Sequence, residues 1–271
     1  MRFGALIRGL VAGVAVLAFG STLPTSCGLV LAQSMPDAAR QFAPHNAAVL
    51  SAIATRDLYT GTDMNQLKAI AEYARQALRS SPLETAALRD LAIIDMMQGD
   101  DESARVAFSL VGSATRRDYQ SHAWLYADAI DHQNYRKALS EADIVLRQSP
   151  SPSSDFLSGF IRAAHGTPIA NMMVPLLATR PPWRWLYLTN AGKIGDPDTT
   201  YRIFMGLRQR GAPASAQELG PYFLRGALGD TPRKLLDHWQ NIVLGQPASS
   251  GVRIIDGDFK GLDAPPPFNW T

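Results

Sequence analysis

The chain of 271 residues is 46% hydrophobic, which is enough for a large core in one or two domains. Its 26 basic and 24 acidic side chains leave a formal net charge of only +2. Because these charges are balanced and scattered along the sequence, we expect no nucleic-acid partner and no surface for acidic lipid.

Residues 1–32 have the order of a secretory leader. Arg2 and Arg8 precede an apolar run, and small side chains follow as far as Ala32. This order predicts a signal peptide that is cut after Ala32. Alternatively, residues 9–32 are long enough to cross the inner membrane as an uncleaved anchor. Both interpretations predict that the rest of the chain is exported, and we favour cleavage, which gives a periplasmic protein.

The single cysteine, Cys27, falls within this leader. Lipid attachment at Cys27 is less favoured than an incidental cysteine, because Pro24 stands where a lipoprotein signal has an aliphatic residue. If the leader is cut after Ala32, the mature chain has no cysteine and therefore no disulfide, thiol nucleophile or zinc–thiolate site. Residues 33–45 are expected to form a linker.

An internal repeat follows the linker. Pro82 and Pro150 end two stretches that align 68 residues apart, and a third copy fits midway between them. The copies are residues 51–84, 85–118 and 119–152. Their period of 34 residues is the length of one helix–turn–helix unit in a solenoid.

The copy at 85–118 shows the pattern most clearly. Leu88, Leu91 and Ala92 are spaced as on one face of a helix that is buried on one side. Gly99 then predicts the end of this helix, since glycine is common where a helix ends in a left-handed turn. The apolar positions of the second helix are Ala104, Phe108 and Val111.

The neighbouring copies keep the same signals. In residues 119–152, Gln133-Asn134 occupies the place of the turn, Ala138 takes the place of Ala104, and Pro150 ends the second helix. The first copy has a regular second helix that ends at Pro82. Its first helix, expected near residues 46–58, is less regular, as is typical of a terminal unit.

These residues resemble the signature of tetratricopeptide repeat (TPR) proteins. The matching features are the pair Leu91-Ala92, the turn Gln98-Gly99-Asp100, the small Ala104 and Ala138, the aromatic Phe108 and the prolines that end two copies. The match is good in 85–150 and partial in 51–84, and it lacks the tryptophan that is common in the first helix. In TPR proteins the first helices line a concave face where partner peptides lie.

Projected onto this sequence, the resemblance implies a partner-binding groove with an apolar stripe flanked by one arginine. Its residues would be Tyr59, Arg89, Ile93, Met96, Gln120, Ala127 and Ile130. Such a groove suits an apolar or acidic peptide, because methionine adapts its shape to a partner. The alternative is that these side chains only pack against neighbouring helices.

Beyond Pro150 the period fades, but glycine, proline and aspartate still separate pairs of predicted helices. The pairs are 153–165 with 168–179, 183–193 with 197–210, and 215–228 with 231–244. We therefore predict an all-α fold, a TPR-like α-solenoid of about six helix pairs. Residues 46–152 would form the repeats and 153–245 their diverged continuation.

Residues 246–271 are predicted to form an extended, proline-rich tail with a strand at 252–255. The tail resembles the opening of a small β-sandwich that is appended to exported TPR proteins. Those proteins are often associated with exopolysaccharide or envelope assembly, and the resemblance implies the same setting here.

Residues that carry chemistry are few and do not form a recognised motif. The five histidines show no metal-ligand spacing, and we expect no metal and no cofactor. Asp256, Asp258 and Asp263 are better explained as a polar turn than as a calcium site. Of Trp183 and Trp185, which are two residues apart on a predicted helix, at most one is expected to be buried.

The sequence thus favours a non-catalytic scaffold that binds protein partners in the cell envelope, with polysaccharide assembly or export as its setting. The alternative is a carbohydrate-binding protein or a lyase-like enzyme on the same helical scaffold. That alternative requires His122, Tyr126, Trp183 and Arg184 to meet in one cleft.

Overall fold

The turn residues singled out by the repeat fix the helix ends. Gly99 has φ +81° and Gln133, 34 positions later, has φ +56°, so both adopt the left-handed conformation that ends a helix. The next residue caps the following helix in each case. Asp100 Oδ1 accepts from the Ser103 N–H at 3.1 Å, and Asn134 Oδ1 accepts from the Lys137 N–H at 3.2 Å.

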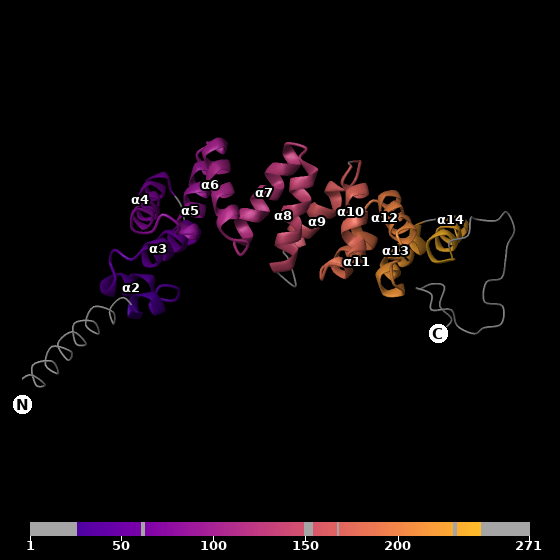
Figure 1. Cartoon of the computed structure of the whole chain (residues 1–271), viewed down its shortest axis with the longest axis horizontal. Coiled ribbons are helices and arrows are strands. Elements are labelled where there is room, and N and C mark those ends of the chain that lie inside the picture. The colour runs from indigo at the N-terminus through magenta and orange to yellow at the C-terminus, as the bar shows by residue number, and fades with distance from the viewer. Residues whose placement is uncertain (1–25, 61–62, 149–153, 167, 230–231, 245–271) are drawn as a thin grey trace, which may run out of the picture. The chain divides into compact units, whose positions relative to one another are not determined.

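The computed structural model describes residues 26–60, 63–148, 154–166, 168–229 and 232–244, and these are almost entirely helical (Figure 1). The helices are α2 Pro36–Phe42, α3 Ala47–Thr60, α4 Met64–Ser80, α5 Thr85–Met97, α6 Asp101–Ala114, α7 Tyr119–Asp131, α8 Tyr135–Gln148, α9 Ser154–Ala163, α10 Ile169–Ala178, α11 Arg184–Ile194, α12 Pro197–Gln209, α13 Ala216–Gly229, α14 Pro232–Trp239 and the π-helix η1 Gln240–Leu244.

The predicted all-α fold is confirmed, and within the described ranges the helices α3 to α14 form six consecutive pairs. The helices α5 and α7 begin 34 residues apart, at Thr85 and Tyr119. The following helices α6 and α8 keep the same interval. The repeat is less regular at its start, where α3 begins at Ala47, and α2 lies within residues 33–45, the predicted linker.

The chain divides into two compact units, residues 1–125 and 126–271, and the division falls within α7. In unit 1, α3 packs against α4 and α5, and α5 packs against α6. Small side chains let these helices approach closely, because Ala54, Ala74 and Ala87 are fully buried between them. Phe108 fills the space beyond and stacks on Trp124 with 4.6 Å between the ring centroids.

In unit 2, alternate helices form two layers. The helix α11 packs against α9 and α13, whereas α12 packs against α10 and η1. An aromatic cluster holds α9 and α11 together, since Phe160 of α9 meets the rings of Trp183 and Tyr187 edge to face. Trp183 is buried and Trp185 is 56% exposed, which confirms the prediction that at most one of them is buried.

The N-terminal part of unit 1 contains an additional packed segment. Residues 26–31 are helical, and Ala32, only 5% exposed, joins a small core with Ala39 and Ala43 of the α2 region. A Cβ atom at Gly28 would lie 2.7 Å from the Cβ of Ala43, so only glycine permits this approach. The apolar run of the predicted leader and the whole C-terminal tail, with its predicted strand, lie outside the described residues.

None of the helices in the described ranges combines the length and the apolar character that a membrane span requires.

Candidate functional site

A cleft of about 680 Å³ opens in unit 1 between the segment before α2, the helix α3 and the N-terminal half of α5. The helices α3 and α5 are the first helices of consecutive pairs, the position in which the TPR resemblance places a groove. The cleft is lined by Leu29, Ala32, Gln33, Ser34, Pro36, Ala48, Ser51, Ala52, Thr55, Arg56, Glu84, Ala86 and Arg89.

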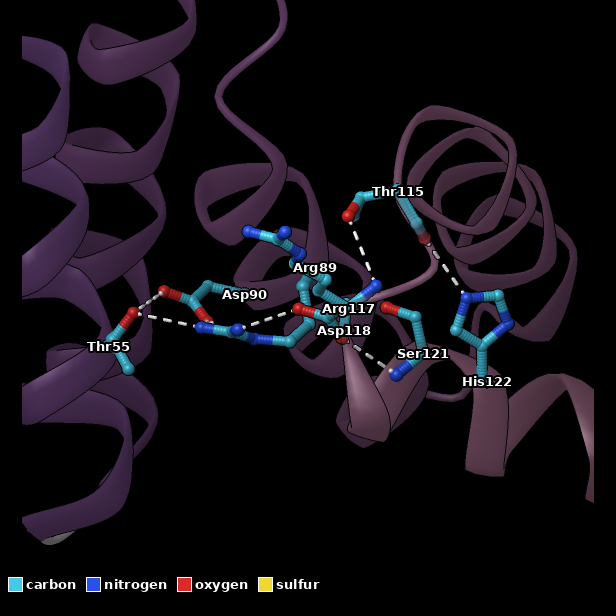
Figure 2. A network of polar contacts seen from close by, with 8 residues as sticks. All are labelled: Thr55, Arg89, Asp90, Thr115, Arg117, Asp118, Ser121 and His122. Atoms are coloured by element: carbon cyan, nitrogen blue, oxygen red, sulfur yellow. Dashed lines mark hydrogen bonds and ion pairs between the residues drawn. The ribbon is translucent and has the colours of Figure 1, made fainter. Parts of the chain in front are cut away.

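Two residues of this lining, Thr55 and Arg89, belong to a network of polar and charged side chains (Figure 2). Arg89 of α5 donates to Asp118 Oδ2 at 2.9 Å, to Asp90 Oδ1 at 3.0 Å and to Thr55 Oγ1 at 3.1 Å. The Thr55 hydroxyl in turn donates to Asp90 Oδ2 at 2.5 Å. Arg89 and Thr55 line the cleft, so the network fixes part of its wall.

The carboxyl group of Asp90 has no exposed surface. Burial raises its pKa above the ordinary value, although the guanidinium of Arg89 and the hydroxyl of Thr55 oppose the shift. A buried carboxylate is tolerated only when it is paired and hydrogen-bonded. Removal of Arg89 would therefore disturb the core of unit 1 as well as the cleft.

The network continues from Asp118 into α7 (Figure 2). Asp118 Oδ1 accepts from the Ser121 N–H at 2.9 Å and so caps α7. His122, which is buried, donates from Nε2 to the carbonyl oxygen of Thr115 at 3.0 Å. These bonds hold the turn between α6 and α7, and together with Arg89 they connect α3, α5 and α7 within unit 1.

The seven residues of the sequence-predicted groove have different surroundings. Of those in unit 1, Arg89 lines the cleft, Tyr59 and Met96 are 56% and 39% exposed, and Ile93 packs against two clusters of the core. Gln120 is exposed. In unit 2, Ala127 is exposed and Ile130 packs against the core. That a partner contacts these residues stays a prediction.

Sequence reasoning missed most of the cleft wall. Gln33, Ser34 and Pro36 lie within residues 33–45, which the sequence predicts to be a linker. Glu84 precedes α5 and is half-buried, and this burial raises the pKa of its carboxyl group. Its position before a helix could have drawn attention to it, since acidic residues favour helix N-termini.

The four residues that a carbohydrate-processing site would need each have separate structural partners. His122 bonds to Thr115, as described above, and Tyr126 packs against the rings of the α9 phenylalanines. Trp183 Nε1 donates to Asp143 Oδ1 at 2.8 Å, and Arg184 forms an ion pair with Glu218.

Within the described ranges, no three His, Cys, Asp or Glu side chains are placed to share a metal ion. The aspartates considered as a calcium turn, Asp256, Asp258 and Asp263, lie outside those ranges.

The fold and the cleft define a helical-repeat protein with an open cleft between consecutive first helices. In comparisons with models of known protein families and with curated proteins, nothing matched this chain. The likeness to TPR proteins therefore remains a resemblance, carried by the residues of the repeat and by the paired helices.

Proposed function

We propose that this protein is a non-catalytic scaffold that holds a segment of a partner protein in the cleft of unit 1. The observation that carries the proposal is the position of the cleft between α3 and α5, where TPR-like stacks present their binding face. A cleft of about 680 Å³ is large enough for several side chains of an extended peptide.

The chemistry of the lining suits a peptide with both apolar and charged groups. Ala48, Ala52 and Ala86 give small apolar surface, and Arg89 and Glu84 add opposite charges to the lining. Because Asp90 and Asp118 both bind the guanidinium of Arg89 and hold it in place, a partner would meet a preformed surface. Preformed surfaces lower the entropic cost of binding.

The setting that we propose for this activity is the cell envelope, within polysaccharide assembly or export. The support for it is the leader-like order of residues 1–32 and the resemblance of the tail to the sandwich of exported TPR proteins. Binding is favoured over carbohydrate processing because the candidate residues for that chemistry, such as Trp183 and Arg184, are engaged in structural bonds.

Photo-crosslinking in the full chain tests the proposal. A photoreactive residue at Ala86 or Gln33, both in the cleft lining, should capture a discrete partner from envelope extracts. The same residue at Val106 or Leu110, which are about half exposed on α6, is the matched control and should not.

A second variant distinguishes binding in the cleft from nonspecific binding elsewhere on the surface. Ala48→Trp fills the cleft from α3 and should abolish the cross-link at Gln33, while circular dichroism shows an unchanged helix content. Capture from Val106, or capture at Gln33 that survives Ala48→Trp, would overturn the proposal. Met96→Asp tests the sequence-predicted groove in the same assay, since Met96 lies outside the cleft lining.

A further inference from the structure

We infer that a second groove, on unit 2, binds an acidic peptide segment in an extended conformation. The groove lies between α10 and α12 and has a volume of about 460 Å³. It is lined by Asn171, Val174, Tyr201, Arg202, Met205, Gly206, Gln209 and Arg210. It belongs to a different unit from the cleft described above and does not depend on the function proposed for that cleft.

The charge of this groove is of one sign. Arg202 and Arg210 both line it, and the described lining contains no acidic side chain. Asp198 of α12 lies one turn before Arg202 but outside the lining, and residues 199–217 contain no Asp or Glu. An anionic partner is therefore attracted along the whole groove, because no carboxylate of its own wall opposes the attraction.

The two guanidinium groups are available to a partner. Arg202 donates to the hydroxyl of Thr199 at 3.1 Å, and neither Arg202 nor Arg210 forms an ion pair within the described part of the chain. Two other arginines of unit 2 are paired with acidic side chains, Arg147 with Asp143 and Arg184 with Glu218. Arg208 of α12 donates instead to the carbonyl oxygens of Ile242 and Val243, so Arg202 and Arg210 are the arginines of this segment that line the groove.

The spacing of the two arginines indicates how a peptide would lie. Arg202 lies in α12 and Arg210 directly follows its last residue, and their eight positions correspond to about 12 Å along a helix. An extended chain advances about 3.3 Å per residue, so carboxylates roughly three to four residues apart match the two charges. Gln209, seven positions after Arg202, lies on the same face of α12 and offers an amide to the peptide backbone.

The floor of the groove is apolar and closely packed. Gly206 of α12 faces Val174 of α10, and a Cβ atom on Gly206 would lie 2.8 Å from Val174 Cγ2. Met205 lies beside this contact and adds an adaptable apolar surface. The groove therefore offers two charges above an apolar strip, as an acidic peptide with small apolar residues requires.

A polysaccharide fits this lining less well. Sugar rings usually stack on an open aromatic face, and Tyr201 is the aromatic residue of the lining. Its ring is already stacked on His238 with 4.2 Å between centroids, and its hydroxyl accepts from Asn241 Nδ2 at 3.1 Å. The amides of Asn171 and Gln209 instead suit hydrogen bonds to a peptide backbone.

Fluorescence anisotropy with the full chain tests the inference. The probe is a fluorescein-labelled Gly/Ser peptide with Glu at every fourth position, and the same peptide with Gln in place of Glu is the neutral reference. We expect the acidic probe to bind more tightly than the neutral one, and its affinity to fall as salt is added. The double variant Arg202→Gln/Arg210→Gln should weaken the acidic probe by about fivefold or more.

A matched variant controls for net charge. Arg116→Gln/Arg162→Gln removes the same charge from exposed positions outside the groove and should leave the affinity unchanged. Equal weakening by both double variants, or none by Arg202→Gln/Arg210→Gln, would overturn the inference. So would tighter binding of an oligogalacturonate that is lost in the groove variant, since the ligand would then be a sugar. Cross-linking at Ala86 in unit 1 is independent of all these outcomes.

Discussion

The ion pair between Arg184 and Glu218 offers a quantitative test of the structure of unit 2. Their side chains are 7% and 10% exposed, and Nε and Nη2 of Arg184 bond the two carboxylate oxygens at 2.9 and 3.2 Å. The same guanidinium donates to the carbonyl oxygens of Leu177, Ala212 and Pro213 at 3.2, 3.2 and 2.9 Å. One side chain thus joins the end of α10, the start of α11 and the turn before α13.

The loss of stability expected on removing Arg184 follows from the buried carboxylate that remains at Glu218. Arg184→Leu leaves the carboxylate of Glu218 buried, with the Ser215 N–H at 2.8 Å as its one remaining donor among the described residues. Breaking a buried pair in this way costs about 3–5 kcal/mol of unfolding free energy. Glu218→Leu should cost about 3 kcal/mol, at the lower end, because the guanidinium keeps its three carbonyl partners. The double variant should fall short of the sum of the single costs by about 2–3 kcal/mol.

Urea unfolding followed by tryptophan fluorescence measures these free energies. Trp183, Trp185 and Trp239 lie in described parts of unit 2, so a Trp124→Phe background reduces the signal from unit 1. Additive effects of the two substitutions, or a loss below about 1 kcal/mol for Arg184→Leu, would refute this account of the pair. The second outcome would also reopen a functional role for Arg184.

Three further comparisons test the local geometry and the pH dependence. Gln133→Gly should raise the free energy of unfolding by about 1 kcal/mol, because φ +56° strains glutamine but not glycine, and a lower melting temperature would contradict this. Gly206→Ala should lower the free energy of unfolding by about 1–3 kcal/mol, because the new methyl group pushes α12 away from α10. Gly159→Ala is the control and should stabilise the chain, since the space around that position is open. Equal effects of the two substitutions in thermal melts would argue against the close contact. Bonds from Thr199 hold the pKa of Asp196 below its ordinary value of 3.8, so the folded state favours the carboxylate. This stabilisation is present above pH 3.8 and is lost as the pH falls through the pKa of the folded state. Over that pH range, the melting temperature of the wild type should fall relative to that of Asp196→Asn. A difference in melting temperature that does not change with pH would be inconsistent with the shift.

Helix ends were predictable from the sequence because they depend on local chemistry. The left-handed positions Gly99 and Gln133 recur at the interval of the repeat, and Gly195-Asp196-Pro197 marks a helix start in the diverged half. These signals act within a few residues of the chain. They therefore survive even where the period itself fades.

The site was less predictable because it depends on distant residues. The periodicity of α5 places Arg89 on a face that could meet a partner, but it does not show that Asp118, 29 positions later, binds the same guanidinium. Likewise, nothing local indicates that Thr55 completes the network from α3. Which charged side chains become buried depends on how the helices pack, and the sequence pattern of the repeat does not show this.

Small residues near the N-terminus suit both a leader and a packed segment. Gly28 and Ala32 are small, as residues before the cut of a leader are, and their small size also allows residues 26–32 to pack on Ala39 and Ala43. A cut after Ala32, as the sequence predicts, would remove Leu29 and Ala32 from the cleft wall and would uncover Ala39 and Ala43, which share a core cluster with Ala32. The cleft of the cleaved chain would then lack two of its apolar lining residues. If the leader is cut there as predicted, the proposed binding site loses part of its wall.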